Sequence, residues 1–354
     1  MANIEKEIDQ TIISNERFDQ LWSNNRKKAN TPHKRLPPFL LLENHKVASS
    51  GNITVVSGAQ KSGKSAFQGM IISKFLNPVP LYDTPALEVF PNTDKKAIIH
   101  IDTEQSEEDH IDFLRSITKR LDINELPDHF YSFGNREESF LQQQNITEKI
   151  LEKASSECGG IHAIFIDGGA DFLASVNDET NGNLLISWFT KMATKHTCPV
   201  FVIVHTNPPA KGVSSGDEKE RGHFGSSLMR KCYSILNVSK KGDVSTVQGR
   251  NLRRARSGVG FQFMWMDNIH LHMEVGQDHK VDIEADRKAE KIKQWKIDAA
   301  HVFGQSTPTY KEAVTGVMKT LDCSEKTAKR RLQDWRENGI IKASDIDKKY
   351  RLDI

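Results

Sequence analysis

One segment of the sequence carries the residue types that bind a phosphate group. Residues 58–65 read Gly-Ala-Gln-Lys-Ser-Gly-Lys-Ser, which matches the pattern G-x-x-x-x-G-K-[ST]. Glycines let backbone N–H groups curl around phosphate oxygens, and the positive end of a following helix adds to the attraction. Lys64 can reach the β- and γ-phosphates, and the Ser65 hydroxyl can hold Mg²⁺. The alternative, a turn without a ligand, is disfavoured because a chance match in such a chain has odds of roughly one in a hundred.

The predicted nucleotide-binding set is the whole loop and the residue after it. It comprises Gly58, Ala59, Gln60, Lys61, Ser62, Gly63, Lys64, Ser65 and Ala66.

A second candidate is the carboxylate that ends an apolar run. Residues 164–166 read Ile-Phe-Ile and Asp167 follows them. Buried strands often end in aspartate only because a turn follows, so the pattern alone is weak. Beside a phosphate loop, it predicts that Asp167 orients the magnesium-bound water. Asp171, one short turn further, is either a second acid of the site or a structural cap.

A sheet must bring these residues together. Apolar runs predict strands at Ile53–Ser57, Ala97–Asp102, Ala163–Asp167 and Val200–His205. Between them, helical stretches are expected at about 64–76, 106–121, 144–157 and 183–196. Strands that alternate with helices predict an α/β fold with right-handed crossovers and a mostly parallel sheet covered on both faces.

After residue 230 the pattern changes to hairpins and then to helices. Residues 234–248 and 261–273 each predict an antiparallel hairpin. Helical stretches follow at about 285–303, 308–320 and 324–338, and then a short strand pair at 340–342 and 350–352. Three helices and a two-stranded wing make a winged helix-turn-helix.

Four segments are therefore expected along the chain. They are an N-terminal arm over 1–35, an α/β domain over 36–275, a polar linker over 276–284 and a small winged-helix domain over 285–354. The arm contains a short helix with Phe18, Leu21 and Trp22, which packs either on the main domain or on a neighbouring subunit.

Composition excludes several classes of protein. The 354 residues carry 49 Lys and Arg against 47 Asp and Glu, so the net charge of +2 argues against a protein that coats nucleic acid by bulk charge. The four cysteines form no Cys-x-x-Cys pair, which disfavours a disulfide framework and a zinc site. Without a signal-peptide core or a long apolar run, a cytoplasmic protein with no membrane contact is expected.

Taken together, the motifs resemble the RecA-type ATPase core, most of all its hexameric replicative-helicase branch, the DnaB and plasmid RepA type. The resemblance covers about residues 35–275. It implies a catalytic glutamate just past the strand that follows the phosphate-loop helix, where residues 98–104 read Ile-Ile-His-Ile-Asp-Thr-Glu. Glu104 would polarise the attacking water as an ionised carboxylate near the γ-phosphate. The alternative is a surface acid beside Glu107, Glu108 and Asp109.

The resemblance also places a γ-phosphate-sensing residue at the end of the strand 200–205, which makes His205 the candidate. The alternative is a histidine that only makes hydrogen bonds at the end of the strand. The polar loop 209–224 is long for a bare connection. In RecA-like rings the corresponding loop faces DNA, so Lys211, Lys219 and Arg221 would contact DNA phosphates. The alternative is a solvated loop without such contacts.

Residues 249–258 resemble the K-x-R-N-G element of hexameric helicases, with Arg254 at the Lys position and Arg256 at the Arg position. That element reaches the nucleotide of the adjacent subunit, so Arg256 would act in trans with Arg254 assisting. A strip that faces nucleic acid and a solvated face are the alternatives. Ser257 replaces the family's Asn.

The last helix has the features of a recognition helix. Ser324 is an expected N-cap, and Ala328, Leu332 and Trp335 have the spacing of a core face. The basic residues Lys326, Lys329 and Arg330 are then available to DNA phosphates, while the direction of Arg331 stays open. Docking of a protein is the alternative.

As a whole, the resemblance implies an enzyme that uses ATP and Mg²⁺. It would be an oligomeric motor on DNA, with a hexamer as the family's arrangement, and would serve replication, mobilisation or maintenance of a plasmid or other mobile element. Single-stranded DNA would pass through the ring, and duplex DNA could meet the winged helix. The rival hypotheses are a DNA-binding regulator that uses ATP as an assembly switch without unwinding, and a recombination mediator.

Overall fold

The computed structural model describes residues 13–31, 38–206, 222–253, 258–275, 278–304, 306–344 and 349–353, and of residues 278–290 it describes the backbone alone. The helices are α2 Asn15–Asn25, α3 Lys64–Leu76, α4 Glu107–Leu121, α5 Phe140–Glu157, η1 Gly169–Phe172, α6 Glu179–His196, α7 Gly222–Lys231, α8 Asp278–Phe303, α9 Tyr310–Leu321 and α10 Glu325–Glu337. The strands are β1 Leu40–Leu42, β2 His45–Ala48, β3 Ile53–Gly58, β4 Leu87–Val89, β5 Ala97–Asp102, β6 Phe130–Gly134, β7 Ile161–Asp167, β8 Val200–His205, β9 Ser234–Lys241, β10 Val244–Arg250, β11 Gly260–Met266, β12 Leu271–Val275, β13 Ile341–Ala343 and β14 Tyr350–Leu352.

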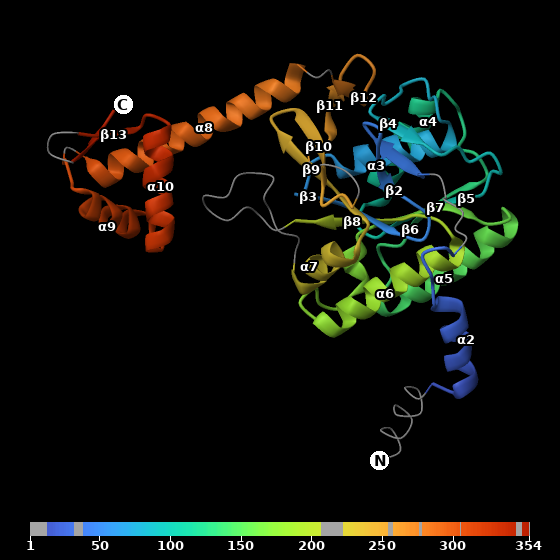
Figure 1. The fold of residues 1–354 in the computed structure, drawn as a ribbon. Helices are drawn as coiled ribbons and strands as arrows, with labels where there is room; N and C mark the ends of the chain where they lie inside the picture. The colour runs from blue at the N-terminus through green and yellow to red at the C-terminus, as the bar shows by residue number, and fades with distance from the viewer. Residues whose placement is uncertain are drawn as a thin grey trace.

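A nine-stranded sheet forms the centre of the molecule, in the order β12-β11-β10-β9-β3-β8-β7-β5-β6 (Figure 1). All pairs from β9 through β3 to β6 are parallel, and the pairs from β9 to β12 are antiparallel hairpins. The expected α/β fold with a mostly parallel sheet is confirmed, and so are the two hairpins. No helix in the described ranges is both long enough and apolar enough to span a lipid bilayer.

Helices cover both faces of the parallel half, which explains its apolar strands. Every residue of β3, β5 and β7 is buried. On one face Phe165 and Phe201 stack with ring centroids 4.6 Å apart, in a core that includes α3 and α4. On the other face Ile166 and Val202 pack in a core that includes α5, α6 and α7. Strands buried on both faces read as continuous apolar runs, and for that reason the sequence reveals them.

Four strands were not expected. A separate three-stranded sheet has the order β2-β1-β4, and β6 closes the edge of the large sheet. Strands β1 and β4 have only three residues each, too few to show an alternating pattern. Strand β6 is mostly half-buried, and its sequence Phe-Tyr-Ser-Phe-Gly is not a continuous apolar run, although aromatic residues favour strands.

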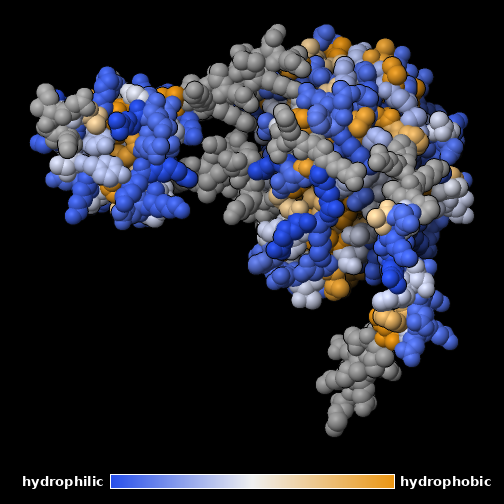
Figure 2. All heavy atoms as spheres, in the orientation of Figure 1, coloured by the Kyte–Doolittle hydropathy of each residue, from blue (hydrophilic) through white to orange (hydrophobic). Residues whose placement is uncertain are grey.

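The N-terminal helix α2 contains Phe18, Leu21 and Trp22 as expected, but none of its residues is buried among the described part of the chain. Ser14 caps it, and its hydroxyl accepts the N–H of Arg17. Phe18 and Trp22 remain 52% and 57% exposed, and Figure 2 shows an apolar patch on this projecting helix. Of the two alternatives for the arm, packing on the main domain is therefore not observed.

The C-terminal elements α8, α9 and α10 enclose a core of their own with Phe303, Leu332 and the fully buried Trp335, and β13 pairs antiparallel with β14. Figure 1 shows them set apart from the large sheet, at the far end of α8. The expected linker over 276–284 is wrong for most of its length, because α8 already begins at Asp278. The segment is polar, but it contains no Gly or Pro between 278 and 303 to break a helix.

Candidate nucleotide site at the carboxyl edge of the sheet

Four parallel neighbours, β3, β8, β7 and β5, end at the same edge of the sheet. Their register pairs Gly58 with His205, and Asp167 with both Ile203 and Asp102. Glu104 follows two residues after β5. The sheet therefore brings together residues that lie up to 147 positions apart in the chain. Ligands of open α/β sheets bind at this carboxyl edge.

The phosphate loop approaches its surroundings too closely for larger residues. A Cβ atom on Gly58 would lie 2.2 Å from the carbonyl oxygen of Val238. Gly63 has a φ of 100°, and a Cβ there would lie 2.9 Å from the ring of Phe263. Helix α3 starts directly after it, at Lys64. The loop thus sits against β9 and β11, with its backbone at a helix N-terminus that favours anions.

Lys64 is held inside the loop. Its ammonium donates to the carbonyl oxygens of Gly58 at 3.0 Å and Ala59 at 2.8 Å, and it contacts His205 Nδ1 at 3.0 Å. Burial lowers the pKa of Lys64, while the charges of Asp167 and Glu104 act in the opposite direction. All three ammonium protons thus have acceptors that a phosphate oxygen could replace.

His205 connects Lys64 to Glu104. Its Nε2 lies 2.8 Å from Glu104 Oε2. An ammonium can only donate, so His205 Nδ1 accepts from Lys64 and Nε2–H donates to Glu104. Both His205 and Glu104 line a cavity of about 430 Å³ together with Asp171 and Phe224. The Glu104 carboxylate therefore faces an open space while one of its oxygens is fixed.

Asp102 positions the turn that carries Glu104. Its Oδ1 accepts the backbone N–H groups of Glu104 and Gln105, both at 2.9 Å. Burial raises the pKa of Asp102, and these two hydrogen bonds oppose the rise. Sequence reasoning missed this role, although an aspartate directly before a turn is a known signal for such bonds.

Asp167 on β7 and Asp171 on η1 add two further carboxyl groups to the site. Burial is the main cause that raises the pKa of Asp167 well above its usual range, and the charges of Asp102 and Glu104 contribute. Asp171 accepts the hydroxyl of Thr103 at 2.8 Å, and burial raises its pKa as well. Asp171 is thus tied to the Glu104 turn, as a second acid at the site.

The donor set fits a magnesium nucleotide. Carboxylate and hydroxyl oxygens are the protein ligands that Mg²⁺ prefers, and Ser65 with Asp167 would supply them. In the loop, the Ser62 hydroxyl is buried without a hydrogen-bond partner among the described residues, which suits a loop that receives phosphate oxygens.

Several expected site residues lie outside the described residues. These are Arg254, Arg256, Lys211, Lys219 and Arg221. Their roles stay predictions.

On α10 the structure places the basic residues at the surface. Ala328, Leu332 and Trp335 are buried as expected, and Lys326, Lys329 and Arg330 are exposed. Lys329 pairs with Glu325 on the same helix at 2.7 Å. The guanidinium of Arg331 lies over the ring of Trp295, 5.3 Å from its centroid, so this residue packs on α8.

No protein-family model matches the chain, and no curated protein matches it. Among solved structures, the chain is similar to the RadB recombinase, with 16% identity and a TM-score of 0.44 over 65% of this chain and 93% of that chain. It is also similar to an ATPase domain, with 11% identity and a TM-score of 0.47 over 64% of this chain and 86% of that chain. Similarity at this level identifies neither a family nor an activity, so the functional conclusion must come from the site.

Proposed function

We propose that the chain is a Mg²⁺-dependent ATPase of the RecA type. The observation that carries this proposal is the connected path from Lys64 through His205 to Glu104 at the mouth of a phosphate loop. A cation at the phosphates and a carboxylate that can activate water are groups that hydrolysis of a γ-phosphate uses, and the imidazole of His205 joins the two here.

In this mechanism Glu104 accepts the proton of the attacking water. One of its oxygens is fixed by His205, and its backbone is fixed by Asp102, so the other oxygen is free to face the cavity. Lys64 neutralises charge on the phosphate chain. Ser65 and Asp167 would hold Mg²⁺, which would supply further positive charge at the phosphates.

His205 acts as the sensor of the γ-phosphate. A phosphate oxygen that accepts a hydrogen bond from Lys64 competes with His205 Nδ1 for the same ammonium group. Any shift of the ring also changes the contact of Nε2 with Glu104. Binding at the loop is thereby coupled to the catalytic carboxylate and to the polar segment that follows β8.

We further propose that Arg256, with Arg254 assisting, completes the site of a neighbouring subunit in a ring or filament. The ATPase rate per chain should then rise with protein concentration until assembly is complete. A rate per chain that does not depend on concentration would contradict a role in trans.

The proposed partner is DNA, and the proposed setting is replication, mobilisation or maintenance of a plasmid or mobile element, as in the DnaB and RepA type. Single-stranded DNA would meet Lys211, Lys219 and Arg221, and duplex DNA would meet the winged helix through Lys326, Lys329 and Arg330. The exposure of the last three residues supports this assignment.

The deciding experiment is ATPase activity with and without single-stranded DNA, combined with a strand-displacement assay. A motor predicts strong stimulation and displacement of the second strand. Slow hydrolysis that is indifferent to DNA, with binding of duplex sites through residues 285–354, would instead favour an assembly switch.

A further inference from the structure

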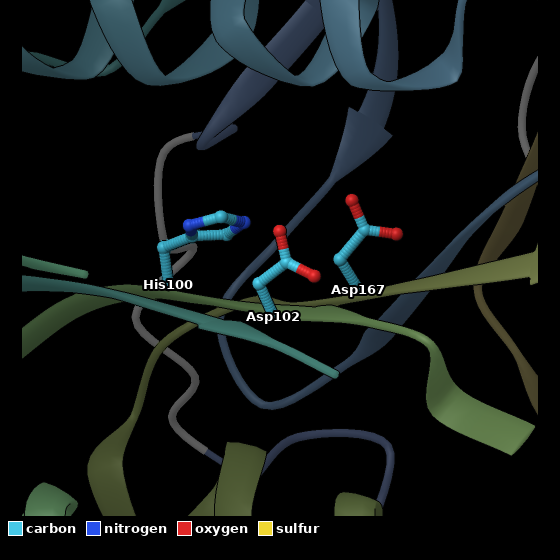
Figure 3. Close-up of side chains that lie close together, drawn as sticks. All are labelled: His100, Asp102 and Asp167. Atoms are coloured by element: carbon cyan, nitrogen blue, oxygen red, sulfur yellow. The ribbon is translucent and has the colours of Figure 1, made fainter. Parts of the chain in front are cut away.

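A second polar cluster lies at the same sheet edge, beside the carboxylates already described (Figure 3). It consists of His100 and Asp102 on β5 and Asp167 on β7, and one potential ligand atom from each lies within 4.8 Å of the others. Residues two apart in a strand share a face, and Asp102 is the register partner of Asp167, so all three side chains point to the same side. Their exposed fractions are 0%, 1% and 4%.

Two buried atoms of this cluster have no hydrogen-bond partner among the described residues. They are Nε2 of His100 and Oδ2 of Asp102. A buried polar group without a hydrogen-bond partner is destabilising. In Figure 3 the ring edge of His100 is directed toward the carboxylates. A cation bound between a nitrogen lone pair and a carboxylate oxygen would satisfy both of these buried atoms.

The remaining atoms of the two side chains are already held. His100 Nδ1 lies 2.8 Å from the Ser132 hydroxyl, which lies 2.6 Å from His110 Nε2. In the tautomer in which Nδ1–H of His100 donates to Ser132 and the Ser132 hydroxyl donates to His110, the free lone pair of His100 is on Nε2. Asp102 Oδ1 accepts two backbone N–H groups. Metal-binding histidines and carboxylates are usually fixed by such outer contacts.

We propose that His100 Nε2, Asp102 Oδ2 and one oxygen of the Asp167 carboxylate bind one divalent first-row transition-metal ion, for which Mn²⁺ is the probe. The second Asp167 oxygen stays available to the Mg²⁺ of the nucleotide. A nitrogen ligand beside two carboxylates favours such an ion over Mg²⁺ and Ca²⁺, which prefer oxygen. Two carboxylates balance its charge. The ion would fix Asp102, and thereby the turn that carries Glu104, and its binding does not depend on nucleotide.

The test uses the full chain without nucleotide, in excess Mg²⁺, titrated with Mn²⁺ and followed by electron paramagnetic resonance. We expect a single tightly bound Mn²⁺, with electron spin-echo modulation from a coordinated ¹⁴N nucleus. His100→Asn should abolish this binding. His162→Asn is the matched control, because His162 is also buried and its Nε2 has no partner in the described part of the chain, but its ring packs against Phe39 and Phe75.

Two further variants keep the test decisive. Ser132→Ala removes only the outer contact of His100 and should weaken Mn²⁺ binding about 10- to 100-fold. If His100→Asn does not fold, the ¹⁴N signal of the wild type decides whether a histidine binds the ion. Lys64→Ala should abolish hydrolysis but leave this Mn²⁺ binding unchanged, which separates the metal site from the proposed ATPase function. Absence of Mn²⁺ binding without nucleotide, or unchanged binding in His100→Asn, would overturn the proposal.

Discussion

The sheet edge and helix α10 hold charged side chains in opposite ways. At the edge, Lys64, Asp102 and Asp167 are buried, and the sheet places residues far away in the sequence beside them: His205 contacts Lys64, and Asp102 is the register partner of Asp167. On α10, Lys326 and Arg330 are exposed, and Lys329 pairs with a residue one turn away. The first arrangement exists only when the whole sheet is folded, whereas the second needs a single helix. Removing a charge should therefore have a large, specific effect at the edge and a small, salt-dependent one on α10.

The sharpest contrast is between two lysines. Lys64→Ala should lower ATPase turnover at least about 1,000-fold, because it removes the cation that faces the transferred phosphoryl group. Lys329→Ala, the exposed counterpart, should change turnover measured without DNA less than about 3-fold. Steady-state phosphate release gives both numbers. Similar losses in the two variants would erase the distinction between the regions.

Asp102 tests whether positioning matters as much as contact with phosphate. Asp102→Ala removes both hydrogen bonds to the Glu104 turn, and a displaced catalytic group costs on the order of 100-fold in kcat. The KM for ATP should stay near the wild-type value. Asp102→Asn keeps an oxygen acceptor and should recover most of the loss in Mg²⁺ buffer. Equal defects in the two variants would show that Asp102 does not act through this turn.

Burial of Asp167 should make the stability of the chain depend on pH. Burial raises its pKa above 3.8, so the folded chain keeps a proton that the unfolded chain loses. The stability from this group is complete below the unfolded pKa and is lost as pH rises through the raised folded pKa. Asp167→Asn should therefore gain in Tm over the wild type, in chelator, as pH rises from about 5 to about 8. A Tm difference that is constant with pH would contradict this account of the edge.

The smallest effect is expected on α10. Replacing Lys326 and Arg330 by Ala together should reduce the slope of log affinity for duplex DNA against log salt by about 2, since each phosphate contact contributes about 0.9. Tm and ATPase activity without DNA should not change. Fluorescence anisotropy over a salt series measures the slope, and an unchanged slope would favour docking of a protein on this helix.

The sequence predicts the buried strands of the sheet better than it predicts the contacts between side chains at the sheet edge. Strands β5 and β8 have the predicted bounds because fully buried strands are uninterrupted apolar runs. The order that places β7 between β5 and β8 depends on tertiary packing and is not encoded in any one segment. Strand β6 was missed, and with it Ser132, so the contact of Ser132 with His100 could not be foreseen.

The site residues could be predicted from the sequence, but the contacts between them could not. Lys64 and Ser65 could be predicted because their motif is local, and Glu104 and His205 followed from resemblance. The hydrogen bond between Glu104 and His205 joins residues 101 positions apart, so only the folded sheet reveals it.

In the proposed mechanism Glu104, held by His205 and by the Asp102 turn, activates the water that attacks ATP. Glu104→Gln keeps the size of the side chain and removes its basicity. In a single-turnover experiment with radiolabelled ATP, the variant should bind ATP with near wild-type affinity and hydrolyse it about 10²- to 10⁴-fold more slowly. Hydrolysis at the wild-type rate would contradict the assignment.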